Sequence, residues 1–103
     1  MTNKVLSMLG LCARARKVAS GEFQTEKAIK EGKARLVIVA EDASENTKKL
    51  FHNKSEFYEV PCFVYGTKES LGHAIGNEMR ASLAVMDEGF ATEIQKRLQE
   101  VEN

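Results

Sequence analysis

Apolar residues follow two alternating patterns along the chain. Short runs that are apolar throughout are typical of strands covered on both faces, whereas apolar residues three or four positions apart are typical of amphipathic helices. The uninterrupted runs predict buried strands at residues 36–40, 60–65 and 81–86, and a weaker signal indicates a short strand at 17–19. The helical spacing predicts helices over residues 3–14, 22–31, 45–58, 68–75 and from 88 onward.

Residues suited to helix ends support these boundaries. A polar or small residue before a helix can satisfy its free amides, and a glycine after it adopts the left-handed cap conformation with little strain. We expect N-caps at Ser20 or Gly21, Ser44, Thr67 and Asp87, and glycine-terminated helices at Gly32 and Gly76. The alternation of strands and helices then predicts an α/β domain with helices on both faces of a small sheet. With no internal repeat or linker, residues 1–103 form one domain.

Composition narrows the class of protein. At 43% apolar and 29% charged residues, the chain is typical of an ordered, soluble globular domain. Fifteen basic and fifteen acidic residues cancel, which argues against a generic polycation but allows a basic face. We see no transmembrane run and no signal peptide, and we expect no membrane association. Cys12 and Cys62 lack metal or redox spacing and are expected to be buried free thiols in the cytoplasm.

A basic cluster stands just before the first glycine turn. Arg14, Arg16 and Lys17 precede the Val-Ala-Ser-Gly stretch that ends at Gly21. One interpretation is a solvated surface, and the other is that these charges lie beside the turn and attract phosphate. A helix that opens on a glycine turn, here with Glu22 in its first turn, is also a geometry that binds anions. Most such helix starts are only structural, so geometry alone leaves this open.

The sequence does not place residues that could act together in catalysis, such as a nucleophile and a histidine, in a recognisable pattern. The acidic pair Glu41-Asp42 has no histidine nearby in the chain. Ser70 and His73 share one predicted helix, but a capping serine and a surface histidine explain them more simply. His52 has no second ligand at helical spacing. We therefore expect no enzyme activity, no metal and no cofactor.

Several segments together resemble the kink-turn-binding family of ribosomal proteins, the archaeal L7Ae and eukaryotic L30e type. The segments that carry the resemblance are residues 21–27, 33–42, 60–61, 67–72 and 81–85, together with Gly76. Residues 9–17 and 87–90 are more similar to the small bacterial YlxQ-type branch. The resemblance covers roughly residues 3–101, and the order and spacing of the segments make it specific.

The resemblance implies a three-layer α/β/α sandwich around a mixed sheet of about four strands. It also implies a monomeric, non-catalytic protein that binds kink-turns in structured RNA, with possible protein partners in the same ribonucleoprotein. Transferred onto this chain, the RNA-binding positions are Gly21, Phe23, Gln24, Lys27, Lys68, Asn77, Glu78, Met79 and Arg80. Met79 has two interpretations: a loop side chain that folds back onto the core, or one that packs on a base.

One departure from the family pattern concerns specificity. The family's Asn-Glu pair at the helix start is Phe23-Gln24 here. Glutamine can accept one hydrogen bond and donate another, whereas phenylalanine can only stack. Two alternatives therefore remain beside kink-turn binding: a protein-interaction adapter that uses Phe23 and Met79, or an accessory to an RNA-modifying enzyme.

Overall fold

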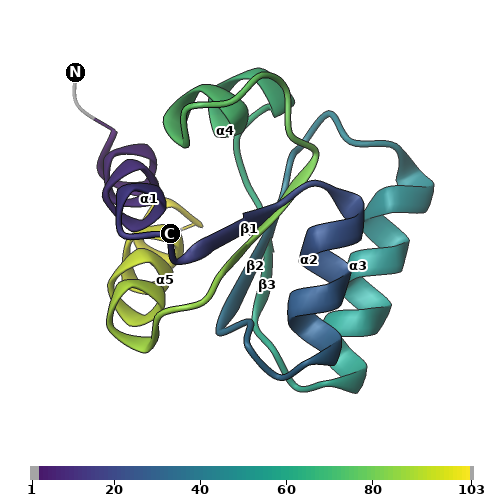
Figure 1. Cartoon of the computed structure of the whole chain (residues 1–103). Helices are drawn as coiled ribbons and strands as arrows, with labels where there is room; N and C mark the ends of the chain where they lie inside the picture. The colour runs from purple at the N-terminus through teal and green to yellow at the C-terminus, as the bar shows by residue number, and fades with distance from the viewer. Residues whose placement is uncertain (1–2, 103) are drawn as a thin grey trace.

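A four-stranded mixed sheet forms the middle layer of the molecule (Figure 1). The computed structural model describes the backbone of residues 3–102 and the side chains of residues 3–100. The strands are β1 (Val18–Ser20), β2 (Leu36–Val39), β3 (Cys62–Val64) and β4 (Ser82–Val85), in the spatial order β1-β4-β2-β3. Strand β4 is antiparallel to both of its neighbours, and β2 and β3 are parallel.

Helices cover both faces of this sheet. They are α1 (Lys4–Arg14), α2 (Glu22–Lys30), α3 (Glu45–Phe57), α4 (Lys68–Ala74) and α5 (Glu88–Glu102). Figure 1 shows α2 and α3 side by side on one face, while α1 and α5 pack together on the other and α4 contacts α1. This arrangement confirms the predicted α/β/α sandwich. No helix within residues 3–102 is both long enough and apolar enough to cross a membrane.

The two central strands hold the core together. All four residues of β2 and all four of β4 are buried, as their uninterrupted apolar sequences predicted. Each helix layer adds fully buried side chains to one face of the sheet. These include Leu9 of α1, Ile29 of α2, Phe51 of α3, Leu71 of α4 and Ile94 of α5. Burial of such apolar side chains is the main favourable contribution to folding.

Most of the predicted helix caps are present. The side chains of Ser44 and Thr67 accept hydrogen bonds from the backbone amides of Thr47 and Ser70, and Asp87 Oδ2 accepts one from Phe90 at 2.9 Å. Gly32 and Gly76 follow α2 and α4 with positive φ angles of 73° and 79°. The capping signals in the sequence therefore located helix ends to within a residue or two.

The third predicted strand differs from what we expected. Residues 60–65 read as a fully buried strand, but β3 comprises only Cys62–Val64 and lies at the edge of the sheet. With a neighbour on one side only, its side chains are partly accessible, and Val64 is 49% exposed. Pro61 stands one residue before the strand, where its carbonyl still accepts a hydrogen bond from the amide of Val37 at 2.8 Å. Strand β1 also begins one residue later than predicted.

Both cysteines are free thiols. Cys12 is fully buried, as expected, whereas Cys62 is only half-buried. Burial raises the pKa of the Cys12 thiol from 9.0 to about 11, with a further increase from the Asp87 carboxylate and an opposing effect of Lys17. Burial also raises the pKa of Cys62. Both thiols are therefore protonated at neutral pH.

The raised pKa of Cys12 predicts a loss of stability in alkali. Because the folded state holds this proton more tightly than the unfolded state, the stabilisation is complete below pH 9 and is lost as the pH rises toward 11. Between pH 8 and 10.5, urea unfolding should show the free energy of unfolding falling by about 2 kcal/mol more in the wild type than in Cys12→Ala. An identical pH dependence in the two proteins would contradict this assignment.

Candidate functional site

The turn between β1 and α2 is open and has an unusual conformation. Gly21 has φ 88° and ψ 160°, a region that is almost exclusive to glycine. Its amide donates a hydrogen bond to the carbonyl of Ser82 at 3.0 Å, which fixes the turn to β4. No side chain caps α2, whereas each of the other four described helices has a capping side chain. The amides of the first turn of α2 are therefore available to a ligand.

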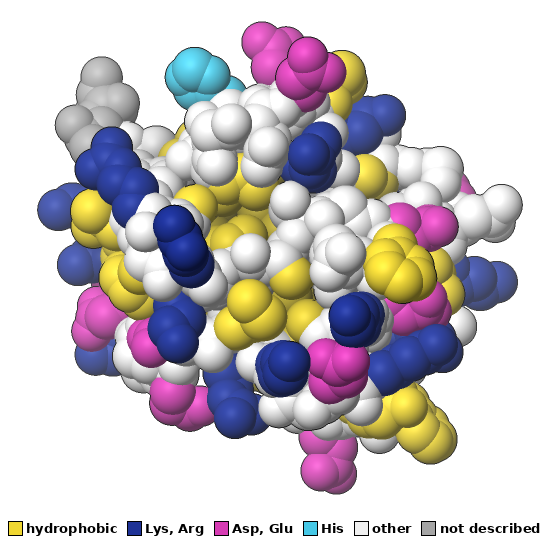
Figure 2. All heavy atoms as spheres, viewed as in Figure 1, with side chains coloured by type: hydrophobic (Ala, Val, Ile, Leu, Met, Phe, Trp, Pro, Cys, Tyr) yellow, Lys and Arg dark blue, Asp and Glu magenta, His cyan; other side chains and the backbone are white. Residues whose placement is uncertain are grey.

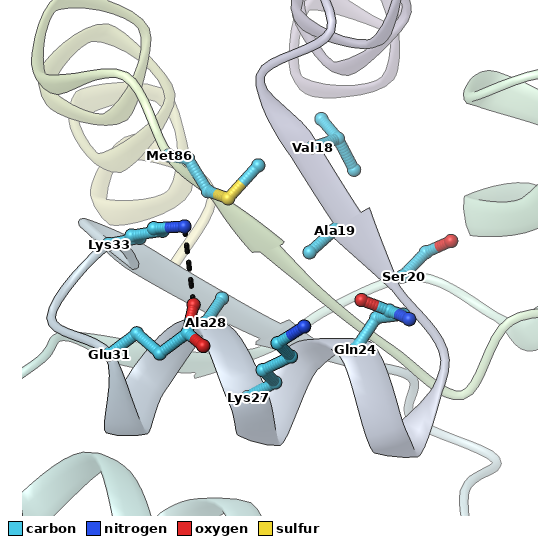
Figure 3. A pocket seen from close by; sticks show the side chains of 9 residues that line it. All are labelled: Val18, Ala19, Ser20, Gln24, Lys27, Ala28, Glu31, Lys33 and Met86. Carbon is cyan, nitrogen blue, oxygen red and sulfur yellow. Dashed lines mark ion pairs between the residues drawn. The ribbon is translucent and has the colours of Figure 1, made fainter.

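Side chains of α2 border a hollow next to this turn. Phe23 is 72% exposed, so its ring is presented to solvent at the start of α2. Gln24 and Lys27 line a cavity of about 460 Å³ between α2 and β1, together with Ser20 and Met86. Figure 3 shows Gln24 and Lys27 extending from α2 toward β1. The hollow combines the Lys27 cation, the Gln24 amide and apolar surface with an ion pair between Lys33 and Glu31, whose charged atoms lie 3.2 Å apart.

A second segment, the α4–β4 loop (Asn77–Arg80), is held tightly against α4. The amide of Asn77 donates to the carbonyl of Gly72 at 2.8 Å. A Cβ at position 72 would overlap the backbone carbonyl of Glu78, so only glycine permits this approach. Met79 is 57% exposed and does not fold back onto the core. Of the two interpretations of Met79, the structure therefore favours a side chain presented to solvent.

Arg80 connects the two segments. Its Nε donates to Ser20 Oγ at 3.2 Å, at the end of β1 and directly before Gly21. Its backbone amide donates to the carbonyl of Lys68 at 3.0 Å, at the start of α4. The β1–α2 turn, the first turn of α4 and the α4–β4 loop are thus joined at one end of the sheet.

The acidic pair after β2 contributes to the same region as a structural element. Asp42 Oδ1 accepts a hydrogen bond from the amide of Lys68 at 2.8 Å, beside the cap that Thr67 supplies to α4. Sequence reasoning considered this carboxylate for acid–base chemistry and missed its role in holding α4. It also missed Ser20 as the partner of Arg80, and Gly72 as the contact surface for the loop, because both depend on contacts between distant segments.

The predicted binding residues therefore form two connected groups. Gly21, Phe23, Gln24 and Lys27 belong to the β1–α2 side, and Lys68, Asn77, Glu78, Met79 and Arg80 belong to the α4 side. Arg80 of the second group donates a side-chain hydrogen bond to Ser20, the residue directly before Gly21 of the first group. The structure brings the groups together, and their roles in binding remain predictions.

The cations of this protein differ in whether they have a carboxylate partner. Ion pairs in the described residues occupy cations such as Lys30, Lys33, Arg35 and Lys54. Within that part of the chain, ion pairs involve none of Arg14, Arg16, Lys17, Lys27, Lys68 and Arg80. Figure 2 shows Lys and Arg side chains over the face that runs from α1 to α2, with Asp and Glu side chains among them. Cations without a carboxylate partner are thus available to an anionic ligand on this side.

The residues considered for catalysis have other contacts. Ser70 Oγ accepts from the amide of Thr67, completing a reciprocal capping box, and His73 is exposed on α4. His52 lies 3.3 Å from the carboxylate of Glu56, one turn along α3. No group of three His, Cys, Asp or Glu side chains in the described chain is arranged to hold a metal ion.

Comparison with known proteins gives consistent matches. Residues 3–95 match the model of the ribosomal protein L7Ae/L30e/S12e/Gadd45 family. The RNA-binding protein YlxQ of Bacillus subtilis (strain 168) is 45% identical over 87 residues, which are 84% of this chain and 87% of that protein. The RNA-binding protein YlxQ of Enterococcus faecium is 40% identical over 96 residues, 93% of this chain and 92% of its own.

A solved structure is also closely similar. It is that of a protein of unknown function from Bacillus halodurans C, with a TM-score of 0.92 and 40% sequence identity. The match covers 95% of this chain and 99% of that chain. The whole sandwich, including the segments around the site, is therefore shared with a protein of known structure.

The contact between Gly72 and the α4–β4 loop can be tested by substitution. Gly72→Ala should lower the free energy of unfolding by about 1–3 kcal/mol, because backbone atoms of the loop must move. Amide chemical shifts of residues 77–80 should change most. The matched control is Gly89→Ala in α5, where a Cβ would lie 3.3 Å from Asp87 Oδ2, a side-chain atom that needs to shift by only a few tenths of an ångström, so the loss of stability should be smaller. Equal stability of the two variants would show that the loop does not depend on Gly72.

Proposed function

Because the chain belongs to the ribosomal protein L7Ae/L30e/S12e/Gadd45 family, we propose that it is a non-catalytic RNA-binding protein that recognises a kink-turn or a related bent internal loop. The observation that carries the proposal is the connection of the β1–α2 turn to the α4–β4 loop through Arg80 and Ser20. The relatives named RNA-binding protein YlxQ support an RNA ligand. The protein acts as a monomer in the cytoplasm, within or beside a ribonucleoprotein.

The geometry suits recognition of RNA by shape, exposed bases and phosphates. The uncapped amides at the start of α2 suit a phosphate or a base edge near Gly21. Gln24 offers one acceptor and two donors to a base edge, and Lys27 offers a charge to the backbone. Two exposed apolar side chains, Phe23 on one segment and Met79 on the other, stack on or wedge against unpaired bases.

The pair Phe23-Gln24 sets the expected strength of this recognition. A carboxylate in place of Gln24 would accept hydrogen bonds from the amino and imino groups of guanine, whereas the neutral amide accepts fewer and donates in return. Phe23 adds stacking surface but no hydrogen bond. Recognition of the sheared G·A pairs of a kink-turn therefore depends more on stacking and backbone contacts in this protein.

A calorimetric titration with a kink-turn hairpin tests the proposal directly. The control RNA is the same hairpin with its tandem G·A pairs replaced, and both are titrated at two salt concentrations. We expect the replacement to weaken binding by at least about tenfold, which corresponds to roughly 1.4 kcal/mol. Equal affinity for both hairpins would contradict kink-turn recognition. Weak binding that is equal for both hairpins would favour another RNA target or a protein-interaction adapter instead.

Substitutions on α2 test the assigned residues. Gln24→Ala and Lys27→Ala should each weaken kink-turn binding by about tenfold, and Lys27→Ala should also reduce the salt dependence. Lys30→Ala is the matched control, because Lys30 is on the same helix but lies 4.0 Å from the carboxylate of Glu26 in an ion pair. If the three variants bound equally well, α2 would not contact the RNA as proposed.

A further inference from the structure

We infer that the α1–β1 corner (residues 14–17) is a second RNA-binding site, which contacts phosphates of a stem that continues past the kink-turn. The inference rests on the proposed function and extends it to a surface outside the family-like binding residues. Its three cations are Arg14, Arg16 and Lys17, and all three are exposed. The chemical group recognised is the phosphodiester backbone, so binding here is independent of base sequence.

Arg16 occupies a left-handed backbone position that favours glycine. After α1, the amide of Arg16 donates to the carbonyl of Ala13 at 2.9 Å, and that of Lys17 donates to Cys12 at 3.0 Å. These two bonds define the Schellman motif, in which the residue after the cap is left-handed. Arg16 accordingly has φ 61°. The equivalent positions after α2 and α4 are Gly32 and Gly76, so the chain uses glycine there but an arginine at the corner.

The corner is rigid and its charges are available. The carbonyl of Lys17 accepts a hydrogen bond from the amide of Met86 at 2.8 Å, which ties the corner to the end of β4. The last carbonyls of α1 are occupied by the Schellman bonds, so the negative helix end is partly satisfied. The Asp87 carboxylate, at the start of α5, raises the pKa of the Cys12 thiol, whereas Lys17 lowers it, so both charges lie near this end of α1. Asp87 Oδ2 accepts from the Phe90 amide.

The corner is continuous with the proposed kink-turn surface. Strand β1 connects Lys17 to Gly21, and its rise gives a separation of about 13 Å between their Cα atoms. The cavity that contains Gln24 and Lys27 runs beside this strand and includes Val18. Between α1 and the end of α4, Arg14 lines a second hollow, of about 300 Å³, together with His73 and Gly76. An RNA stem leaving the site can therefore follow β1 to the corner.

The chain offers a matched control position on the far side of the sheet. After α3, the amide of Glu59 donates to the carbonyl of Glu56 at 3.2 Å, and that of Val60 donates to Ser55 at 2.8 Å. Glu59 thus has the same left-handed conformation, with φ 58°. It precedes β3, the edge strand opposite β1. Replacing either residue by glycine relieves the same backbone strain, but only Arg16→Gly removes a cation from the corner.

The experiment compares Arg16→Gly, Arg16→Lys and Glu59→Gly in binding to three RNAs. These are a short kink-turn hairpin, the same hairpin with its stems lengthened, and a plain duplex RNA at low salt. Arg16→Gly should weaken binding of the long hairpin and of the duplex by about threefold to tenfold and should reduce the salt slope by about 1. It should bind the short hairpin like the wild type. Its thermal midpoint should be equal or higher, which excludes a folding defect.

The controls separate charge from backbone strain. Arg16→Lys keeps the charge and should bind all three RNAs like the wild type. Glu59→Gly should raise the thermal midpoint without lowering the affinity for any of the three RNAs. An Arg16→Gly protein that binds the long hairpin and the duplex normally, or loses affinity equally for short and long hairpins, would overturn the inference. So would a wild type with no affinity for the duplex.

The two proposals fail in different ways. If the wild type binds the hairpins with intact and replaced G·A pairs equally, kink-turn recognition is wrong. The duplex measurement still decides whether the corner binds phosphate.

Discussion

The two central strands require cover on both faces, and the rest of the structure follows from that requirement. Strands β2 and β4 are buried along their whole length, so neither face of the sheet can meet water without a large loss of hydrophobic stabilisation. Two helical layers are the solution that this short chain adopts. The flanking strands β1 and β3 are short and partly exposed, because each lies at an edge of the sheet and has a neighbouring strand on one side only.

The position of the site is a consequence of the strand pairing. Because β1 and β4 are antiparallel, the end of β1 lies beside the start of β4, with Ser20 opposite Leu83. The turn that follows β1 and the loop that precedes β4 must then emerge at the same end of the sheet. The hydrogen bond from Arg80 to Ser20 fixes a proximity that the topology already imposes. Segments 60 residues apart in sequence can thus form one surface on a rigid base.

Local signals predicted the elements well, and contacts between distant segments set the limit of prediction. Buried strands, capping side chains and terminal glycines were readable because each depends on neighbours within a few residues. The partial exposure of β3 could not be read from the sequence, because whether a strand lies at the edge of the sheet depends on the order of the strands. Two further contacts involve residues from separate segments. Asp42 accepts a hydrogen bond from the start of α4, and the backbone of Glu78 packs directly against Gly72. The site residues came from the family resemblance, and the structure adds the way in which they are joined.

The uncapped start of α2 has a consequence for local stability. The first amides of this helix have no side-chain partner, while the other described helices close their first turns with side chains. A helix end of this kind frays more readily, and its amides exchange hydrogen sooner than those of the core. Although α2 is formed from Glu22 without a ligand, a ligand that supplied acceptors to these amides should slow their hydrogen exchange before that of any other part of the helix.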